Sequence, residues 1–232
     1  MLAAMPILAP LPSSTILFEG DSLSGFRSAP LLDSWAWIRL TGATHGFPER
    51  VGEWVFCHRP DLRLSVRNGA IGGSTIADLL ERFDRHVVPV KPGIIVLTVG
   101  TNDCGQGVPL EKFSADLREY ARRLHELCGG RLLHVGGFKP MPGAGPDSAH
   151  ALPTMPAYMG AAAATVTAAG GLAVDAGSVL AHKATELVAQ YSGHSIFHDG
   201  THFGPVGHEI LAGVVLRALG LIELPGDPTA AG

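Results

Sequence analysis

Cysteine is scarce in this sequence of 232 residues, which contains three, at Cys57, Cys104 and Cys128. An odd number of cysteines without C-x-x-C spacing excludes a disulfide framework and a cysteine-based zinc site. One optional disulfide stays open, but three reduced thiols in a reducing compartment are the simpler interpretation. A chain of this length can bury a sizeable hydrophobic core, so the fold needs no such covalent support.

Charge is scarce as well, and no cluster of lysine or arginine stands out along the chain. Charged residues make up 16% of the sequence, and 17 basic against 21 acidic side chains give a formal net charge of −4. Without a basic face, we expect no nucleic-acid partner. Apolar residues reach 46%, and this proportion excludes an intrinsically disordered chain.

The sequence also lacks an apolar run of the ~18 residues that a membrane-spanning helix requires. Its opening segment, MLAAMPILAPLPSS, is mildly apolar, but prolines interrupt it and it lacks the positively charged start of a signal peptide. We therefore expect no membrane span and a cytoplasmic location. Secretion of a mature form, after removal of a leader, is the alternative.

Short apolar runs alternate with longer helical patterns along the chain. The predicted strands are Thr15–Phe18, Leu62–Val66, Ile94–Val99, Leu132–Val135 and Leu172–Val174. The predicted helices are Pro48–Cys57, Ile76–His86, Leu110–Cys128, Met155–Ala169 and Pro205–Leu219. Continuous rather than alternating hydrophobicity is typical of strands that are covered on both faces. Because no repeat or linker is visible, the pattern predicts one doubly wound α/β domain with five parallel strands.

In a doubly wound sheet, ligands bind just beyond the carboxyl ends of the strands. After the first strand, the segment ILFEGDSLSG places Ser22 where a helix begins. The positive helix end and the unpaired backbone N–H groups there favour a developing anion. The alternative is that Asp21 and Ser22 only cap the helix.

Two further strand ends offer neutral hydrogen-bond donors. Gly73, in VRNGAIGGSTIADLL, can bring a backbone N–H close to an oxyanion because it has no side chain. The glycines of this segment do not form the G-x-G-x-x-G pattern of a dinucleotide-binding site. The alternative is a plain turn in which Ser74 or Thr75 caps the helix that follows. Asn102, in IIVLTVGTNDCG, carries an amide that donates without titrating, although Asn-Asp is also an ordinary turn sequence.

Asp199 and His202 lie in a glycine-rich segment just before the last predicted helix. A carboxylate that orients an imidazole is the arrangement that makes serine a nucleophile. The rival interpretation is a metal site on histidines spaced by four, His194, His198 and His202. Glycines interrupt the helix that this spacing requires, and no carboxylate or thiol cluster supports it, so we expect no metal ion.

These segments follow the order of the sequence blocks of the SGNH, or GDSL, hydrolase family, which the chain resembles over about residues 15–219. The matching blocks are Gly20-Asp21-Ser22-Leu23, Asn68-Gly69-Ala70-Ile71-Gly72-Gly73, Gly100-Thr101-Asn102-Asp103 and Asp199-Gly200-Thr201-His202. Ala70 departs from the pattern, because many members have glycine there. The resemblance implies a three-layer αβα sandwich, flavodoxin-like in outline, as a single domain across residues 1–232. It argues against the α/β-hydrolase family, whose nucleophile motif is G-x-S-x-G.

Carried over residue by residue, the resemblance implies a serine ester hydrolase that needs no cofactor. Ser22 is then the nucleophile, His202 the general base and Asp199 its partner. The backbone N–H groups of Ser22 and Gly73 and the side-chain amide of Asn102 form the oxyanion hole.

Substrate choice depends on two loops that we expect to overhang the site, 25–37 and 138–158. The second is rich in proline and glycine and lacks the long apolar helix of a lipase lid. This favours short acyl esters, acetylated carbohydrates included, over long lipids. Trp35 and Trp37 either stack on a sugar ring or belong to the core. The alternatives are a lysophospholipase or thioesterase and, in a different class, a non-catalytic binding domain with the same fold.

Overall fold

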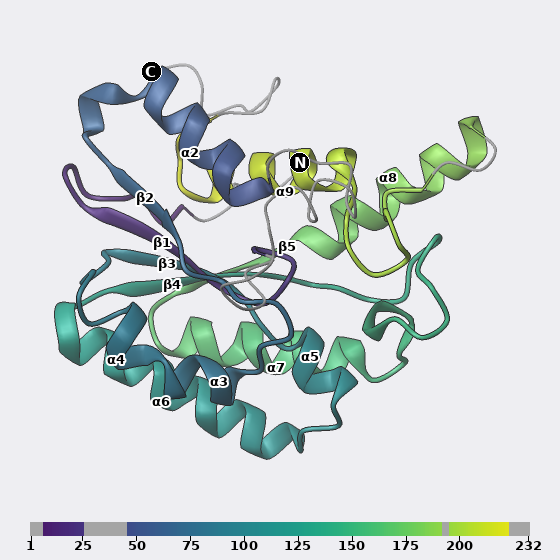
Figure 1. Cartoon of the computed structure of the whole chain (residues 1–232), viewed down its shortest axis with the longest axis horizontal. Helices are drawn as coiled ribbons and strands as arrows, with labels where there is room; N and C mark the ends of the chain where they lie inside the picture. Colours follow the sequence, from purple (N-terminus) through teal and green to yellow (C-terminus); the bar gives the residue numbers. More distant parts are fainter. Residues whose placement is uncertain (1–6, 26–45, 192–194, 223–232) are drawn as a thin grey trace.

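A computed structural model describes residues 7–25, 46–191 and 195–222, and within them five parallel strands form one sheet (Figure 1). The strands are β1 (Thr15–Gly20), β2 (Ser65–Asn68), β3 (Ile94–Thr98), β4 (Arg131–Gly136) and β5 (Leu172–Asp175). Their order across the sheet is β2-β1-β3-β4-β5, so the direction of succession reverses at β1. The predicted fold class is confirmed. In such sheets the reversal point is where ligands bind.

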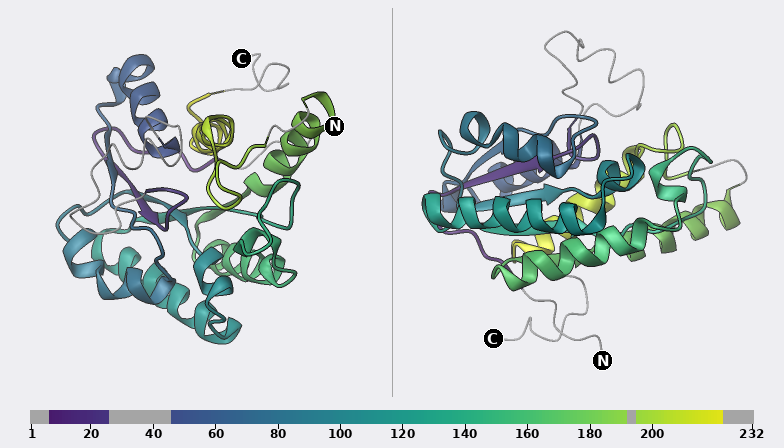
Figure 2. Two further views of the ribbon diagram at one scale, coloured as in Figure 1. Left: turned by 45° about the vertical axis from the view of Figure 1, so that its right-hand side comes forward. Right: turned by 90° about the horizontal axis from the view of Figure 1, so that it is seen from below.

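Helices cover both faces of this sheet and make three layers (Figure 2). One face carries α2 (Phe47–His58), α8 (Ala176–Gln190) and α9 (Pro205–Ala218), and α9 packs against both of the others. The opposite face carries α3 (Ile76–Glu81), α4 (Phe83–His86), α6 (Leu110–Cys128) and α7 (Met155–Ala168), with α6 beside α7. Three short pieces complete the set: η1 (Pro60–Leu62), α5 (Thr101–Gly105) and η2 (Ala149–Ala151).

The core lies between the sheet and these two helical layers. β3 is buried along its whole length, as its continuous apolar run predicted. The helix predicted over Leu110–Cys128 is α6, and it buries an apolar stripe at Phe113, Leu117, Tyr120 and Leu124. Full burial of one such side chain stabilises the folded state by roughly 1.5–3 kcal/mol. In the described part of the chain, no helix is long and apolar enough to cross a bilayer.

The second strand begins later than predicted. Pro60–Leu62 forms a short 3-10 turn that ends at Arg63 in the left-handed region, with a φ of 49°. The strand can start only after this turn, so it spans Ser65–Asn68 rather than Leu62–Val66, with Ser65 level with Thr15 of β1.

The helices also differ from the sequence prediction at three places. The single helix predicted over 76–86 is two helices, α3 and α4, which meet at Arg82. The turn expected around Asn102 is the short helix α5. The helix α8 was not predicted, because small residues make up much of its buried stripe and give a weak hydrophobic pattern. Its start is marked by Asp175, whose carboxylate accepts hydrogen bonds from the backbone N–H and hydroxyl of Ser178.

Candidate active site

The turn that follows β1 carries Ser22. Gly20, at the end of the strand, has a φ of 139°, and a Cβ there would overlap the carbonyl oxygen of Thr98. Only glycine therefore lets the chain leave β1 so close to β3. Asp21 accepts a hydrogen bond from the Leu23 N–H at 3.0 Å, and burial raises the pKa of its carboxyl to about 7. Asp21 thus shapes the turn, while Ser22 stays half-buried at its surface.

Ser22, His202 and Asp199 form one hydrogen-bonded chain, although Ser22 lies 180 positions before His202. The Nε2 atom of His202 lies 3.0 Å from Ser22 Oγ. Its Nδ1 atom lies 2.7 Å from Asp199 Oδ2. The geometry matches that of a serine-hydrolase triad.

Asp199 orients both the ring and the backbone of His202. Its Oδ1 accepts hydrogen bonds from the N–H of Thr201 at 2.9 Å and of His202 at 2.7 Å. Partial burial opposes ionisation of Asp199, but the hydrogen bonds from His202 and Thr201 outweigh it and lower its pKa to about 2. Asp199 is therefore a carboxylate at neutral pH. It favours the tautomer with the proton on Nδ1, so that Nε2 can accept the Ser22 proton.

The segment that carries His202 is a tight loop rather than a helix. An antiparallel bridge pairs Phe197 with Phe203, and the His198 N–H donates to the His202 carbonyl at 2.8 Å. His198 and His202 therefore do not share a helical face, and His194 lies outside the described residues. Among the residues that the structure describes, no group of three or more His, Cys, Asp or Glu could hold a metal ion.

Gly73 lies in the loop after β2, and Asn102 lies in α5, directly after β3; β2 and β3 are the two strands on either side of β1. The amide Nδ2 of Asn102 donates to the carbonyl of Ser74 at 3.1 Å, so the side chain of Asn102 is held against the turn that contains Gly73. One amide hydrogen is used in this bond, and the other can donate to a ligand. Gly73 has a φ of 80°, and a Cβ there would meet nothing within 4 Å.

Asp103 is a structural residue of the site that the sequence prediction missed. Its buried carboxylate accepts from the Ile76 N–H at 3.1 Å and from the Gly100 N–H at 3.2 Å. It thereby joins the start of α3 to the start of α5, the short helix that carries Asn102. Burial raises the pKa of Asp103 to about 6. The only sequence signal was its place beside Asn102.

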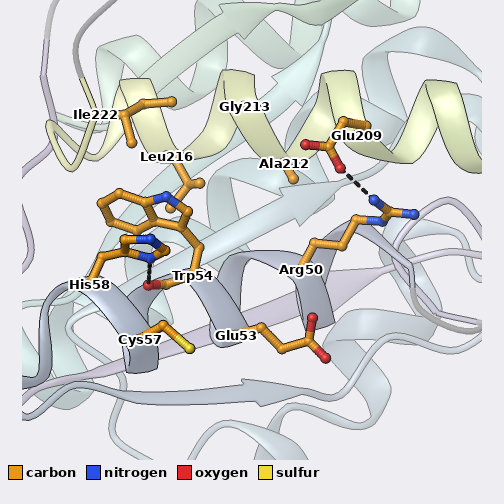
Figure 3. Close-up of a pocket in the computed structure, with 10 residues that line it drawn as sticks. All are labelled: Arg50, Glu53, Trp54, Cys57, His58, Glu209, Ala212, Gly213, Leu216 and Ile222. Carbon is orange, nitrogen blue, oxygen red and sulfur yellow. Dashed lines mark hydrogen bonds and ion pairs between the residues drawn. The ribbon is translucent and has the colours of Figure 1, made fainter.

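A pocket of about 400 Å³ lies between α2 and α9, and none of the predicted site residues lines it (Figure 3). At one end the rings of Trp54 and His58 stack with their centroids 4.7 Å apart. At the other end an ion pair joins Arg50 to Glu209. The pocket thus lies apart from the chain of hydrogen bonds at Ser22.

A serine, a histidine and an aspartate joined in this order by hydrogen bonds form the arrangement that serine hydrolases use on several unrelated folds. Residues 20–210 match the family model of the GDSL-like lipase/acylhydrolase family. The chain therefore belongs to this family and is a hydrolase of ester bonds. This confirms the family resemblance and the enzyme class predicted from the sequence.

Solved structures share the fold at low identity. A protein from Parabacteroides merdae, described as a GDSL-like lipase, is 20% identical, with a TM-score of 0.74 over 94% of this chain and 100% of that one. Axe2, an acetylxylan esterase from Geobacillus stearothermophilus, is 22% identical, with a TM-score of 0.72 over 95% of this chain and 100% of its own. LAE5, an alpha/beta hydrolase enzyme from the metagenome of Lake Arreo, is 20% identical, with a TM-score of 0.72 over 93% of this chain and 99% of its own. No curated protein matches this chain.

Proposed function

We propose that the protein hydrolyses short-chain acyl esters, including acetyl esters of carbohydrates, through an acyl-enzyme on Ser22. The observation that carries this proposal is the hydrogen-bonded chain from Ser22 through His202 to Asp199, with distances of 3.0 and 2.7 Å. A binding domain with the same fold would have no use for a serine hydroxyl aligned with an imidazole and an ionised carboxylate.

In the first half-reaction, Ser22 Oγ forms a bond to the ester carbonyl carbon while His202 Nε2 accepts the hydroxyl proton. The tetrahedral intermediate then collapses, and His202 returns the proton to the leaving alcohol as the ester C–O bond breaks. In the second half-reaction, water attacks the acyl-enzyme and gives a proton to His202. Ser22 Oγ recovers that proton as the carboxylic acid leaves.

The oxyanion of each tetrahedral intermediate requires donors that are already in place. The N–H groups of Ser22 and Gly73 and the Nδ2 of Asn102 are the donors in this proposal. The bond from Asn102 to the Ser74 carbonyl supports it, because that bond holds two of the three donors together. Loss of one such donor costs about 3–4 kcal/mol of transition-state stabilisation.

The preference for short acyl groups is supported by the loop between β4 and α7. This loop contains only the three-residue turn η2, and no long apolar helix that could cover a lipid chain. The fold neighbour Axe2, an acetylxylan esterase, makes an acetylated sugar a sensible test substrate. Trp35, Trp37 and the rest of residues 26–37 lie outside the described residues.

The experiment measures kcat/KM on p-nitrophenyl esters from acetate to palmitate, with the Ser22→Ala protein alongside. We expect acetate and butyrate to be cleaved faster than palmitate and the Ser22→Ala protein to be inactive but folded. A preference for chains beyond decanoate would instead support a lysophospholipase or thioesterase. Wild-type rates in folded Ser22→Ala would overturn the assignment of the nucleophile.

A further inference from the structure

A buried ion pair joins Glu19, in the strand that leads to Ser22, to Arg82. Glu19, in β1, is 1% exposed, and Arg82, at the junction of α3 and α4, is 5% exposed. The guanidinium of Arg82 donates to Glu19 Oε2 from Nη2 at 2.9 Å and from Nε at 3.3 Å. His86 Nδ1 lies 3.0 Å from the other carboxylate oxygen of Glu19. A buried ion pair is by itself a weak source of stability, because desolvation offsets its attraction.

The same guanidinium also binds two loops of the site. Its Nη2 donates to the carbonyl of Gly20 at 3.0 Å, and its Nη1 donates to the hydroxyl of Ser74 at 2.7 Å. Gly20 lies two residues before Ser22, and Ser74 directly follows Gly73. One side chain therefore joins the turn of the nucleophile to the turn of the second oxyanion donor.

The third donor is connected through Ser74 as well. The Ser74 carbonyl accepts from Asn102 Nδ2 at 3.1 Å, while its hydroxyl donates to the Ile71 carbonyl at 2.7 Å and accepts from Arg82. The orientation of Ser74 therefore depends on Arg82, and the orientation of the Asn102 amide depends on Ser74.

We propose that Arg82 is the positioning residue of the oxyanion hole, acting through Gly20 and Ser74 on the donors of Ser22, Gly73 and Asn102. This inference rests on the proposed function. Its consequence is specific to the reaction, because donors aimed at an oxyanion interact more strongly with the transition state than with the ester. Replacement of Arg82 should therefore lower kcat and leave KM nearly unchanged.

The inference also predicts that lysine cannot replace arginine at position 82. A planar guanidinium with five N–H donors can bind the Glu19 carboxylate, the Gly20 carbonyl and the Ser74 hydroxyl at the same time. The ammonium group of a lysine would keep the positive charge beside Glu19. Its N–H donors all come from one nitrogen atom, so it cannot reach all three acceptors. Arg82→Lys is thus a variant that keeps the ion pair and loses the alignment.

The test compares Arg82→Lys with Arg85→Lys, a change at an exposed arginine of α4, in the full chain. The measurements are kcat and KM on p-nitrophenyl acetate, the melting temperature, and Ki for an alkyl boronic acid, which forms a tetrahedral anion on serine. For Arg82→Lys we expect kcat about 10- to 100-fold lower, Ki raised by a similar factor and KM within about twofold. Arg85→Lys should match the wild type in all four values.

If Arg82→Lys fails to fold, a second variant, Ser74→Ala, tests the same inference. Ser74→Ala removes the acceptor of Arg82 Nη1 and leaves the pair with Glu19 intact, so it should lower kcat and weaken binding of the boronic acid. Loss of the hydrogen bonds to Arg82 and to the Ile71 carbonyl should also lower the melting temperature, but the ion pair is kept and the protein should stay folded. Unchanged kcat in either folded variant, or a kcat that falls while Ki for the boronic acid stays constant, would overturn the inference. Ser22→Ala separates the two proposals: an inactive Ser22→Ala beside a fully active Arg82→Lys refutes only the role of Arg82.

Discussion

The imidazole of His150 packs against the ring of Phe203, the neighbour of His202, with ring centroids 5.5 Å apart. Phe138 and Phe197 complete the cluster around this imidazole. Neither ring nitrogen of His150 has a hydrogen-bond partner within the described residues, and burial, with a smaller contribution from nearby His202, lowers its pKa to about 4. A neutral histidine thus joins the loop after β4 to the loop of the proposed base.

The first prediction concerns stability in acid. A histidine whose pKa falls from an ordinary 6.5 to about 4 on folding stabilises the fold above pH 6.5, and this contribution is lost as the pH falls through 4. His150→Leu should therefore flatten the decline in the free energy of unfolding between these pH values, by up to about 3 kcal/mol. Urea unfolding of both proteins at pH 7 and pH 4.5 measures the difference.

His182→Gln, at an exposed position of α8, is the matched control and should leave the decline unchanged. His134 and His208, whose pKa values burial also lowers to about 4, should preserve part of the decline in His150→Leu. An identical decline in the wild type and in His150→Leu would show that His150 does not contribute to it.

The second prediction concerns the pH dependence of hydrolysis. Asp199, with a pKa of about 2, stays ionised across the working range, so it does not itself produce a rise in activity near neutral pH. The rise should follow one histidine-type ionisation, because the base must be neutral to accept the Ser22 proton. Asp199→Asn should move this limb to lower pH, since the imidazolium loses a neighbouring negative charge, and should lower kcat by about 10²- to 10⁴-fold.

Profiles of kcat/KM against pH for both proteins on one acetate ester test this expectation. An unchanged limb together with an unchanged rate in Asp199→Asn would show that Asp199 only closes its turn, through its bonds to the N–H groups of Thr201 and His202.

The third prediction concerns the side-chain donor. Asn102→Ala should lower kcat by about 10²- to 10³-fold with little change in KM, because the amide binds charge that develops only in the transition state. Asn102→Asp keeps the shape but replaces the donor with an acceptor, so it should be no more active than Asn102→Ala. Steady-state kinetics on p-nitrophenyl acetate decide the matter. Full activity of the aspartate variant would mean that Asn102 does not bind the oxyanion.

The fourth prediction concerns the turn after β1. Gly20→Ala should destabilise the fold by more than about 3 kcal/mol, because the methyl group would overlap the Thr98 carbonyl at a φ that alanine rarely adopts. Gly160→Ala, in the middle of α7 with no atom near its Cβ, should stabilise the protein by about 0.5–1 kcal/mol. Thermal unfolding of both variants provides the comparison. Equal melting temperatures would contradict the steric argument at Gly20.

The sequence by itself determined the features that depend on local pattern. The apolar steps of α6 and the continuous run of β3 identified both elements, because side-chain periodicity follows directly from backbone geometry. The short motifs around Ser22, Asn102 and His202 pointed to the site, since glycine and capping residues mark where strands end. Even the pairing of Asp199 with His202 could be predicted, because the two residues are only three positions apart.

The tertiary structure alone decided the features that join distant segments. The position of β1 between β2 and β3 brings the segments that carry Ser22, Gly73 and Asn102 to one edge of the sheet. In the sequence, Arg82 is one basic residue within a predicted helix, and no local pattern indicates its role. Its contacts with Glu19, 63 positions away, and Gly20, 62 positions away, arise only when the strands and helices pack. A guanidinium is buried only where several acceptors converge on it, and that convergence is a property of the assembled layers.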